Sequence, residues 1–195
     1  MAEQQTDYYS IEDYLALEAQ ADQRHEYEGG RIRAMSGGSI SHSLISTNIT
    51  NSLYNRLSDM GCVVLNGDAR LWIDSATSFV YPDAMVICGP IQTAAKNKHS
   101  VINPVLITEV LSKSTESYDR GDKFHKYCSL PSFREYILID QNKPVVDVLY
   151  REEPGYWKMT TAIGLDQSIT LGSMGFDIPL TDLYRNVQDL SEPSF

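Results

Sequence analysis

The stretch FVYPDAMVICGP, residues 79–90, sets one carboxylate, Asp83, into an apolar run of residues that favour β-strands. A second run, LITEVLS at residues 106–112, carries the single carboxylate Glu109 in the same way. Burying an unpaired ionised carboxylate among Val, Ile, Leu and Met side chains is costly. Each carboxylate therefore needs either a cationic partner at a strand end or sheet edge, or a ligand that both carboxylates share.

The length and composition favour one folded domain. The chain has 195 residues, of which 42% are hydrophobic and 22% charged, as in ordinary globular proteins. We place the domain at residues 8–186 and expect the polar, aperiodic ends, 1–7 and 187–195, to be loose. No apolar stretch approaches the roughly 20 residues that cross a bilayer, and the N-terminus lacks the features of a signal peptide. We therefore expect a cytoplasmic protein with no membrane partner.

Two further features of the composition limit the possible partners and chemistry. The formal net charge of −10 repels a polyanion on average, so it opposes a nucleic-acid partner. The three cysteines, Cys62, Cys88 and Cys128, are far apart and flanked by apolar residues. We expect buried thiols at these positions rather than disulfides or metal ligands.

Working outward from residues 79–90, hydrophobic periodicity and turn residues define the other elements. Ser10 and Asp13 form a capping box before a short helix, and Gly29-Gly30 joins two short extended segments as a hairpin. Helices are predicted at 41–59, from Ser114 or Thr115 to Leu130, and at 181–187. Strands are predicted at 62–67, 69–74, 79–88, 104–112, 134–140, 145–151, 155–163 and 168–172. A loop is predicted at 89–103. This order predicts an α/β (α+β) fold with a central mixed β-sheet flanked by helices, a β-hairpin near the N-terminus and extra C-terminal strands.

If the strands that carry Asp83 and Glu109 are neighbours, the two carboxylates can bind one divalent cation. The cation would neutralise both and leave coordination positions for water and a phosphate oxygen. Mg²⁺, or Mn²⁺ in its place, suits this arrangement because Mg²⁺ takes few protein carboxylates and keeps several waters.

YPDAMVIC followed by LITEVLS resembles the PD-(D/E)XK restriction-endonuclease-like superfamily, in which one strand supplies Pro-Asp and the next supplies Glu-X-Lys. The resemblance is greatest to a large bacterial family of uncharacterised proteins described as restriction endonucleases. The residues that carry it are Tyr81-Pro82-Asp83, NPVLI at 103–107, EVLS at 109–112, Ser114-Thr115, Asp119-Arg120-Gly121, Lys123-Phe124, Tyr127, Glu135-Tyr136 and, upstream, His25-Glu26, Gly30, Met35 and His42. The resemblance covers nearly the whole chain and implies a metal-dependent nuclease fold that cuts nucleic-acid phosphodiesters, usually those of DNA.

The lysine of Glu-X-Lys is missing, because Leu111 stands at its position. Strand periodicity would place that lysine on the same face as Glu109. On the following helix, Lys123 lies toward the apolar side, so we hypothesise that it replaces the strand lysine and orients the attacking water or stabilises the transition state. The alternative is a lysine at the edge of a packed helix whose stem alone is buried.

Three residues are candidates for an auxiliary role. His42, near the start of the long helix, shares a side with Ile45 and is either a satisfied core histidine or a contact to substrate phosphate or the metal shell. Glu26 could complete the acidic cluster, as carboxylates of the first helix or hairpin do in some relatives. Lys126 has Asp122 at i−4, a spacing that favours an exposed ion pair.

Other catalytic schemes lack their sequence signatures, since the chain contains no G-x-S-x-G elbow, P-loop or dinucleotide fingerprint. Two functions remain: a metal-dependent endonuclease, and a catalytically degenerate nuclease-fold protein that acts as a binding or interaction module. Leu111 and the net charge favour the second. The first requires Asp83, Glu109 and a lysine nitrogen around a metal-sized cavity, and a homodimer would supply the two sites that cutting two strands needs.

Overall fold

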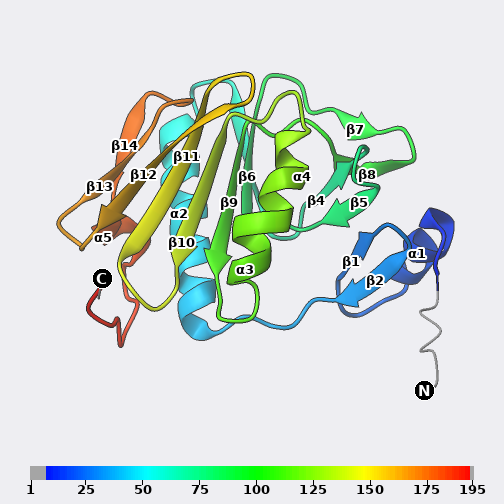
Figure 1. Ribbon diagram of the computed structural model, residues 1–195, viewed down its shortest axis with the longest axis horizontal. Helices are drawn as coiled ribbons and strands as arrows, with labels where there is room; N and C mark the ends of the chain where they lie inside the picture. The colour runs from blue at the N-terminus through cyan, green and yellow to red at the C-terminus, as the bar shows by residue number, and fades with distance from the viewer. Residues whose placement is uncertain (1–7, 194–195) are drawn as a thin grey trace.

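The computed structural model describes residues 8–193, which form two six-stranded sheets and one two-stranded sheet (Figure 1). The central sheet has the strand order β12-β11-β10-β9-β6-β3. Its strands are β3 (Cys62–Asn66), β6 (Ala84–Cys88), β9 (Leu106–Leu111), β10 (Glu135–Asp140), β11 (Val145–Glu153) and β12 (Tyr156–Ile163). β9 and β10 are parallel and the other neighbours antiparallel, so the sheet is mixed, as predicted.

Helices cover both faces of this sheet, which explains why all six residues of β9 are buried. On one face α2 (Ile40–Leu57) packs Ile45 and Ile49 into the same core as Val110. On the other face lies a helical segment made of α3 (Glu116–Tyr118), η1 (Asp119–Lys123) and α4 (Phe124–Cys128). There Tyr127 shares a core with Leu111. Figure 1 shows α4 in front of the central sheet and α2 behind it.

The second six-stranded sheet, which we call the peripheral sheet, has the order β2-β1-β5-β4-β8-β7. Its strands are β1 (His25–Glu28), β2 (Arg31–Ala34), β4 (Arg70–Ile73), β5 (Ser78–Val80), β7 (Thr93–Ala94) and β8 (Asn97–Val101). α1 (Ile11–Glu18) packs Tyr14 against Tyr27 and Phe79 on it. The capping box at Ser10 and the hairpin at Gly29-Gly30 are confirmed.

Two predictions about the strands are wrong. Residues 79–88 form two strands, because β5 and β6 belong to different sheets and the chain passes between them at Tyr81-Pro82-Asp83. Pro82 has no N–H to donate to a ladder, which favours a break there. The predicted loop at 89–103 contains the β7–β8 hairpin at the edge of the peripheral sheet, where polar residues are tolerated because only one neighbour must be matched.

The helix predicted from Ser114 or Thr115 to Leu130 is interrupted. Its middle turn, η1, is a π-helix that contains Gly121, and it buries the side chains of Asp119 and Lys123. Thr115 precedes the segment but makes no side-chain capping hydrogen bond. Helical periodicity identified the segment, but it could not indicate the π turn, which forms where side chains are drawn into the core.

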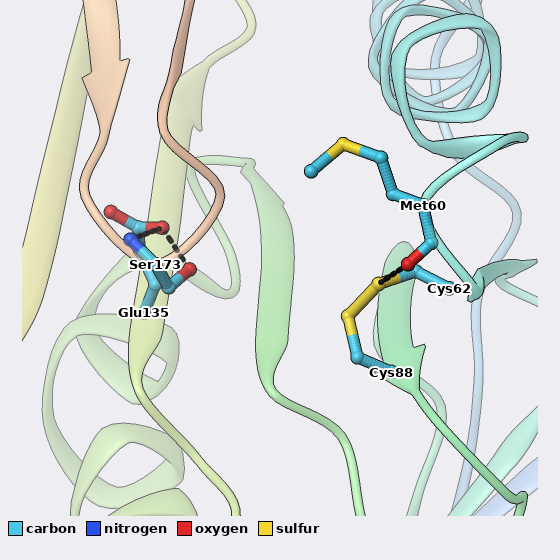
Figure 2. Close-up of a disulfide and its surroundings, with 5 residues drawn as sticks. All are labelled: Met60, Cys62, Cys88, Glu135 and Ser173. Carbon is cyan, nitrogen blue, oxygen red and sulfur yellow. Dashed lines mark hydrogen bonds between the residues drawn. A yellow bond between two sulfur atoms is a disulfide. The ribbon is translucent and has the colours of Figure 1, made fainter.

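The C-terminal region adds a small sheet and packs against the main core. β13 (Ser168–Leu171) pairs with β14 (Phe176–Pro179), a strand that the sequence did not indicate, and α5 (Leu180–Leu183) follows. Glu135 of β10 is fully buried and accepts hydrogen bonds from Gly172 N and from the backbone and hydroxyl of Ser173 (Figure 2).

The chain after residue 186, predicted to be loose, packs Val187 and Leu190 against the core, and Ser191 N donates to Asn142 O. These contacts extend the ordered part of the chain beyond the predicted boundary. The predicted loose ends at 1–7 and at the last two residues lie outside the described residues.

The expectation of three buried thiols is wrong for two of the cysteines. Cys62 and Cys88 are directly opposite each other in the antiparallel β3–β6 pair, and their sulfur atoms form a disulfide (Figure 2). Cys88 is exposed, and Cys128 is free and half-buried. The prediction failed because cysteines 26 positions apart in sequence gave no sign of the register that brings them together. Across residues 8–193, the helices are all too short or too polar to span a membrane.

Candidate active site

Asp83 lies at the point where the chain leaves the peripheral sheet and enters the central one. β6 pairs with β9 from Ala84 onward, opposite Thr108. Beyond that pair, the Asp83 carboxylate takes the place of a strand neighbour, because its Oδ2 accepts a hydrogen bond from Val110 N at 2.7 Å. This contact explains why a carboxylate directly after a proline is tolerated here, and it fixes Asp83 beside Glu109 in the neighbouring strand.

Glu109 is buried on the face of β9 that also carries Ile107 and Leu111. Its Oε1 accepts hydrogen bonds from Lys123 Nζ at 3.0 Å and from Tyr127 OH at 2.7 Å. Burial raises the pKa of Glu109 to about 8; the charge of Lys123 opposes this shift, and nearby carboxylates add to it. The carboxyl group is therefore poised to change its charge near neutral pH, or to bind a cation that keeps it ionised.

Lys123 is surrounded by carboxylates. Its Nζ lies 3.0 Å from Glu109 Oε1, 3.3 Å from Asp119 Oδ1 and 3.5 Å from Glu26 Oε1, and its side chain is 8% exposed. Burial disfavours the charge of Lys123, but these carboxylates outweigh it and raise the pKa well above the usual lysine value. We call Lys123, Glu26, Glu109 and Asp119 the Lys123 cluster.

The π turn holds the Lys123 cluster in position. Tyr136 OH donates to the backbone oxygen of Asp119 at 3.0 Å, from β10. Next to it, Arg120 pairs with Asp147 of β11 at 2.6 Å and with Glu116 at 3.0 Å. These contacts attach η1 to two strands of the central sheet and so fix the backbone from which Lys123 reaches Glu109.

The structure explains how a chain with Leu111 at the lysine position still brings an ammonium group to the strand carboxylate. Leu111 is 3% exposed and packs in the core beneath α4. Lys123 reaches Glu109 from the helical segment instead.

His42 and Glu26 also lie at the site. His42 Nε2 is 3.4 Å from Asp83 Oδ2. Burial lowers the pKa of His42, but the hydrogen bond and charge of Asp83 outweigh it and raise the pKa overall. Glu26, from β1, reaches Lys123 across the boundary between the two sheets.

Lys126 lies outside the Lys123 cluster. It pairs with Glu28 and donates to Tyr118 OH at 3.0 Å. The predicted ion pair with Asp122 is wrong, since Lys126 turns toward β1 instead.

Two residues of the site, Asp119 and Tyr127, were missed as functional candidates. Both belong to the residues that carry the family resemblance, but their spacing from Lys123 is the stronger indication that they lie at the site. Asp119 is at i−4 and Tyr127 at i+4, so a helical segment places both beside Lys123. Oδ1 of Asp119 is buried and, among the described residues, accepts no well-directed hydrogen bond.

The two carboxylates and the lysine line one cavity of about 390 Å³, together with His42 and other polar residues. Four carboxylates line this cavity, Asp83 and the three of the Lys123 cluster, and they outnumber its two Lys and Arg side chains, Lys123 and Arg33. Within residues 8–193 no three His, Cys, Asp or Glu side chains are arranged to hold a metal ion by themselves. The residues nevertheless fit Mg²⁺ in charge and ligand type, because that ion takes one or two carboxylates and completes its shell with water.

Comparison with known proteins identifies a family and a shared fold. Residues 11–181 match the Uma2 family, described as "Putative restriction endonuclease". Two proteins of Synechocystis sp., uncharacterized protein slr1290 and uncharacterized protein sll1609, are each 33% identical to the chain. The alignments cover 91% and 83% of this chain and 92% of each relative.

A crystal structure from Anabaena variabilis, described as "a putative nuclease belonging to DUF820", superposes with a TM-score of 0.71. It is 16% identical and covers 90% of this chain and 97% of its own. This likeness shows that the two chains share a fold, which is restriction-endonuclease-like.

The family match and the fold therefore define a nuclease-like protein of the restriction-endonuclease-like class. The chain belongs to the Uma2 family.

Proposed function

We propose that the protein is a metal-dependent endonuclease that hydrolyses nucleic-acid phosphodiesters, with DNA as its substrate. The observation that carries the proposal is the convergence of Asp83, Glu109 and Lys123 in one cavity, from a sheet junction, a buried strand and a π turn. Membership of a family described as restriction endonucleases supports the same reaction class.

In this proposal Asp83 and Glu109 hold Mg²⁺ or Mn²⁺. When bound, the ion would polarise the phosphoryl group and lower the pKa of a water molecule. The excess of carboxylates over Lys and Arg side chains in the lining supports this assignment, because a divalent cation would relieve the repulsion that helps to raise the pKa of Glu109.

Lys123 acts on the reacting phosphate or on the attacking water in this proposal. Its pKa is raised, so it stays protonated at neutral pH and can donate hydrogen bonds to developing negative charge. The carboxylates around it fix the direction of the ammonium group and leave the cavity side open to a ligand.

The competing function is a catalytically degenerate binding module. Its support is that Lys123 already satisfies Glu109 by a direct ion pair, so the buried carboxylate has a partner without a metal. The net charge of −10 also gives no general attraction for nucleic acid.

The two functions are separated by incubating the purified protein with single-stranded, duplex and branched DNA and with RNA, in Mg²⁺ or Mn²⁺. We expect metal-dependent cleavage that Asp83→Asn reduces roughly 10³-fold, the scale of losing a group that organises transition-state charge. Asp177→Asn, the same change at an exposed position of β14, serves as the control and should keep full activity. Cleavage that survives in Asp83→Asn would exclude this site, and binding without cleavage by the wild-type protein would favour the module.

The proposal also includes an oligomeric state. We propose a homodimer for cutting both strands of a duplex, since each chain carries one candidate site. Its mass in solution, measured by light scattering with and without duplex DNA, tests that assembly.

A further inference from the structure

A second cavity, of about 690 Å³, opens from the candidate active site along α2. It shares with the first cavity the segment Met35–Gly38 and the side chains of His42, Tyr81 and Asp83. Beyond them one wall is formed by one side of α2, from Ser43 to Asn51, and the opposite wall by residues 22–24 and 66–68, which include Asp22 and Asp68. We call this cavity the α2 groove. A ligand that occupied the candidate active site and extended past Asp83 would enter it.

The two sides of α2 differ sharply. One side buries Ile45, Ile49, Leu53 and Leu57 in the core. The other carries hydroxyl and amide side chains into the groove at helical spacing: Ser43, Ser46, Thr47, Thr50 and Asn51. In all 18 residues of α2, Arg56 is the sole Asp, Glu, Lys or Arg.

This composition is unfavourable for helix stability. Ser, Thr and Asn are poorer helix formers than Glu, Lys, Arg or Ala, and Thr47 and Asn51 are exposed, so packing does not require them. The chain has 26 acidic residues, yet this face has none of them. Because Asp22, Asp68 and Asp83 line other parts of the groove, the α2 face is the wall along which a hydrogen-bonding, negatively charged ligand can lie without meeting a carboxylate.

The chemistry of the groove fits a nucleic-acid strand whose backbone is held by neutral donors. Hydroxyl and amide side chains are common partners of phosphate and sugar oxygens. Arg24 and His42 are the cationic groups of the lining, and Arg24 is already paired with Asp68 at 2.9 Å. Binding of duplex DNA relies mainly on Lys and Arg that neutralise phosphates, and Arg24 is the single Lys or Arg among the residues that line this cavity.

The same face of α2 continues to an exposed aromatic residue. Tyr54 follows Thr47 and Asn51 at helical spacing and is 61% exposed. From His42 to Tyr54 a helix rises about 18 Å, and a nucleic-acid strand advances about 3.4 Å per nucleotide in B-form geometry, so the path accommodates about five nucleotides. An exposed tyrosine can stack on a base only if that base is unpaired.

We propose that the α2 groove binds a single-stranded segment of nucleic acid that flanks the cleaved phosphodiester, with its backbone on the hydroxyl and amide face of α2 and an unpaired base on Tyr54. This assignment rests on the proposed nuclease function and names the form of its substrate. The protein would therefore prefer single-stranded or locally opened DNA to a continuous duplex.

The test measures binding of a fluorescent 15-nucleotide single strand by anisotropy, in an Asp83→Asn background that keeps the substrate intact. Thr47→Glu should raise Kd roughly tenfold, because the new carboxylate would repel a nearby phosphate of the strand and solvent screens this repulsion only partly. Thr170→Glu makes the same change at an exposed position of β13, away from the groove. Its Kd should stay within about twofold of the parent value, because repulsion falls with distance from the bound strand. Tyr54→Ala should raise Kd by roughly fivefold or more, and Tyr54→Phe should restore binding, as expected for a stacked base.

Asn51→Glu introduces a carboxylate at a second exposed position on the same face of α2, and its Kd should rise in the same way. With two such variants, a folding defect in one of them does not decide whether the strand binds this face. The inference is overturned if both acidic variants bind like Thr170→Glu, or if a blunt duplex binds as tightly as the single strand. Because this readout is binding, its failure is distinct from failure of the nuclease proposal, which is read from cleavage by the protein with Asp83 intact.

Discussion

The Lys123 cluster and the α2 groove adjoin the same residue, Asp83, yet they are built from opposite kinds of side chain. The cluster is buried and holds one ammonium group among three carboxyl groups, one of which, that of Glu109, has its pKa raised to about 8. The groove is open to solvent, and the α2 side of its lining is neutral. Buried charges interact strongly and keep a fixed geometry, whereas exposed neutral donors exchange readily with water. The difference suggests that one region is suited to bond cleavage and the other to holding a strand that must later leave.

The largest effect on stability is expected from removing the charge at the centre of the cluster. Lys123→Met leaves three buried carboxylates without their ammonium partner, so the free energy of unfolding should fall by about 3–5 kcal/mol without metal. Cleavage should fall roughly 10²-fold or more. Chemical denaturation and a cleavage assay measure the two effects. Full cleavage activity in this variant would remove Lys123 from the proposed reaction.

The disulfide provides a control for the stability loss in Lys123→Met. Cys62 and Cys88 lie at the end of β6 away from Asp83, and their bond closes a loop of 26 residues. Cys88→Ser should lower the free energy of unfolding by about 3 kcal/mol relative to the oxidised protein, with no change in cleavage at temperatures where it is folded. If this variant lost cleavage as Lys123→Met does, instability alone would explain both.

The pH dependence of stability distinguishes the charged region from the neutral one. The pKa of Glu109 is raised to about 8 in the folded protein, so the folded state holds a proton that the unfolded state releases near the ordinary glutamate value. This contribution to stability is complete below about pH 4.5 and is lost as the pH rises through about 8. We expect the melting temperature in EDTA to fall over this range, and the fall to be smaller in Glu109→Gln.

Adding Mg²⁺ should also reduce this fall, because the ion stabilises the ionised carboxylate. Glu135→Gln is the matched control, since Glu135 is buried but bound to neutral donors of the β13–β14 turn. An identical response to Mg²⁺ in Glu109→Gln and Glu135→Gln would contradict metal binding by Glu109.

The smallest expected effect is the salt dependence of strand binding. With one or two phosphate-neutralising groups near the groove, the affinity for a single strand should drop less than about tenfold between 50 and 200 mM salt. A steeper loss, measured by the same anisotropy titration, would show that cations rather than hydroxyl and amide groups dominate binding.

Local patterns predicted much of the fold because they report interactions between residues close in sequence. The capping box at Ser10, the turn at Gly29-Gly30 and the apolar side of α2 all appeared where expected. The same reasoning directed Lys123 toward the sheet, since a helix repeats its faces every few residues. It failed for the break at Pro82 because the run of strand-forming residues continues on both sides while the chain changes sheets.

By itself, the sequence determined that two carboxylates sit in apolar runs of residues and that a lysine on the following helix is the available cation. Only the tertiary structure decided the parts that depend on register and contacts between distant segments. These include the disulfide across β3 and β6, the entry of Glu26 from the peripheral sheet, the role of Asp119, and the groove along α2. The physical reason is that helix and strand periods fix which way a side chain points along its own element, whereas its partner depends on which elements pack together.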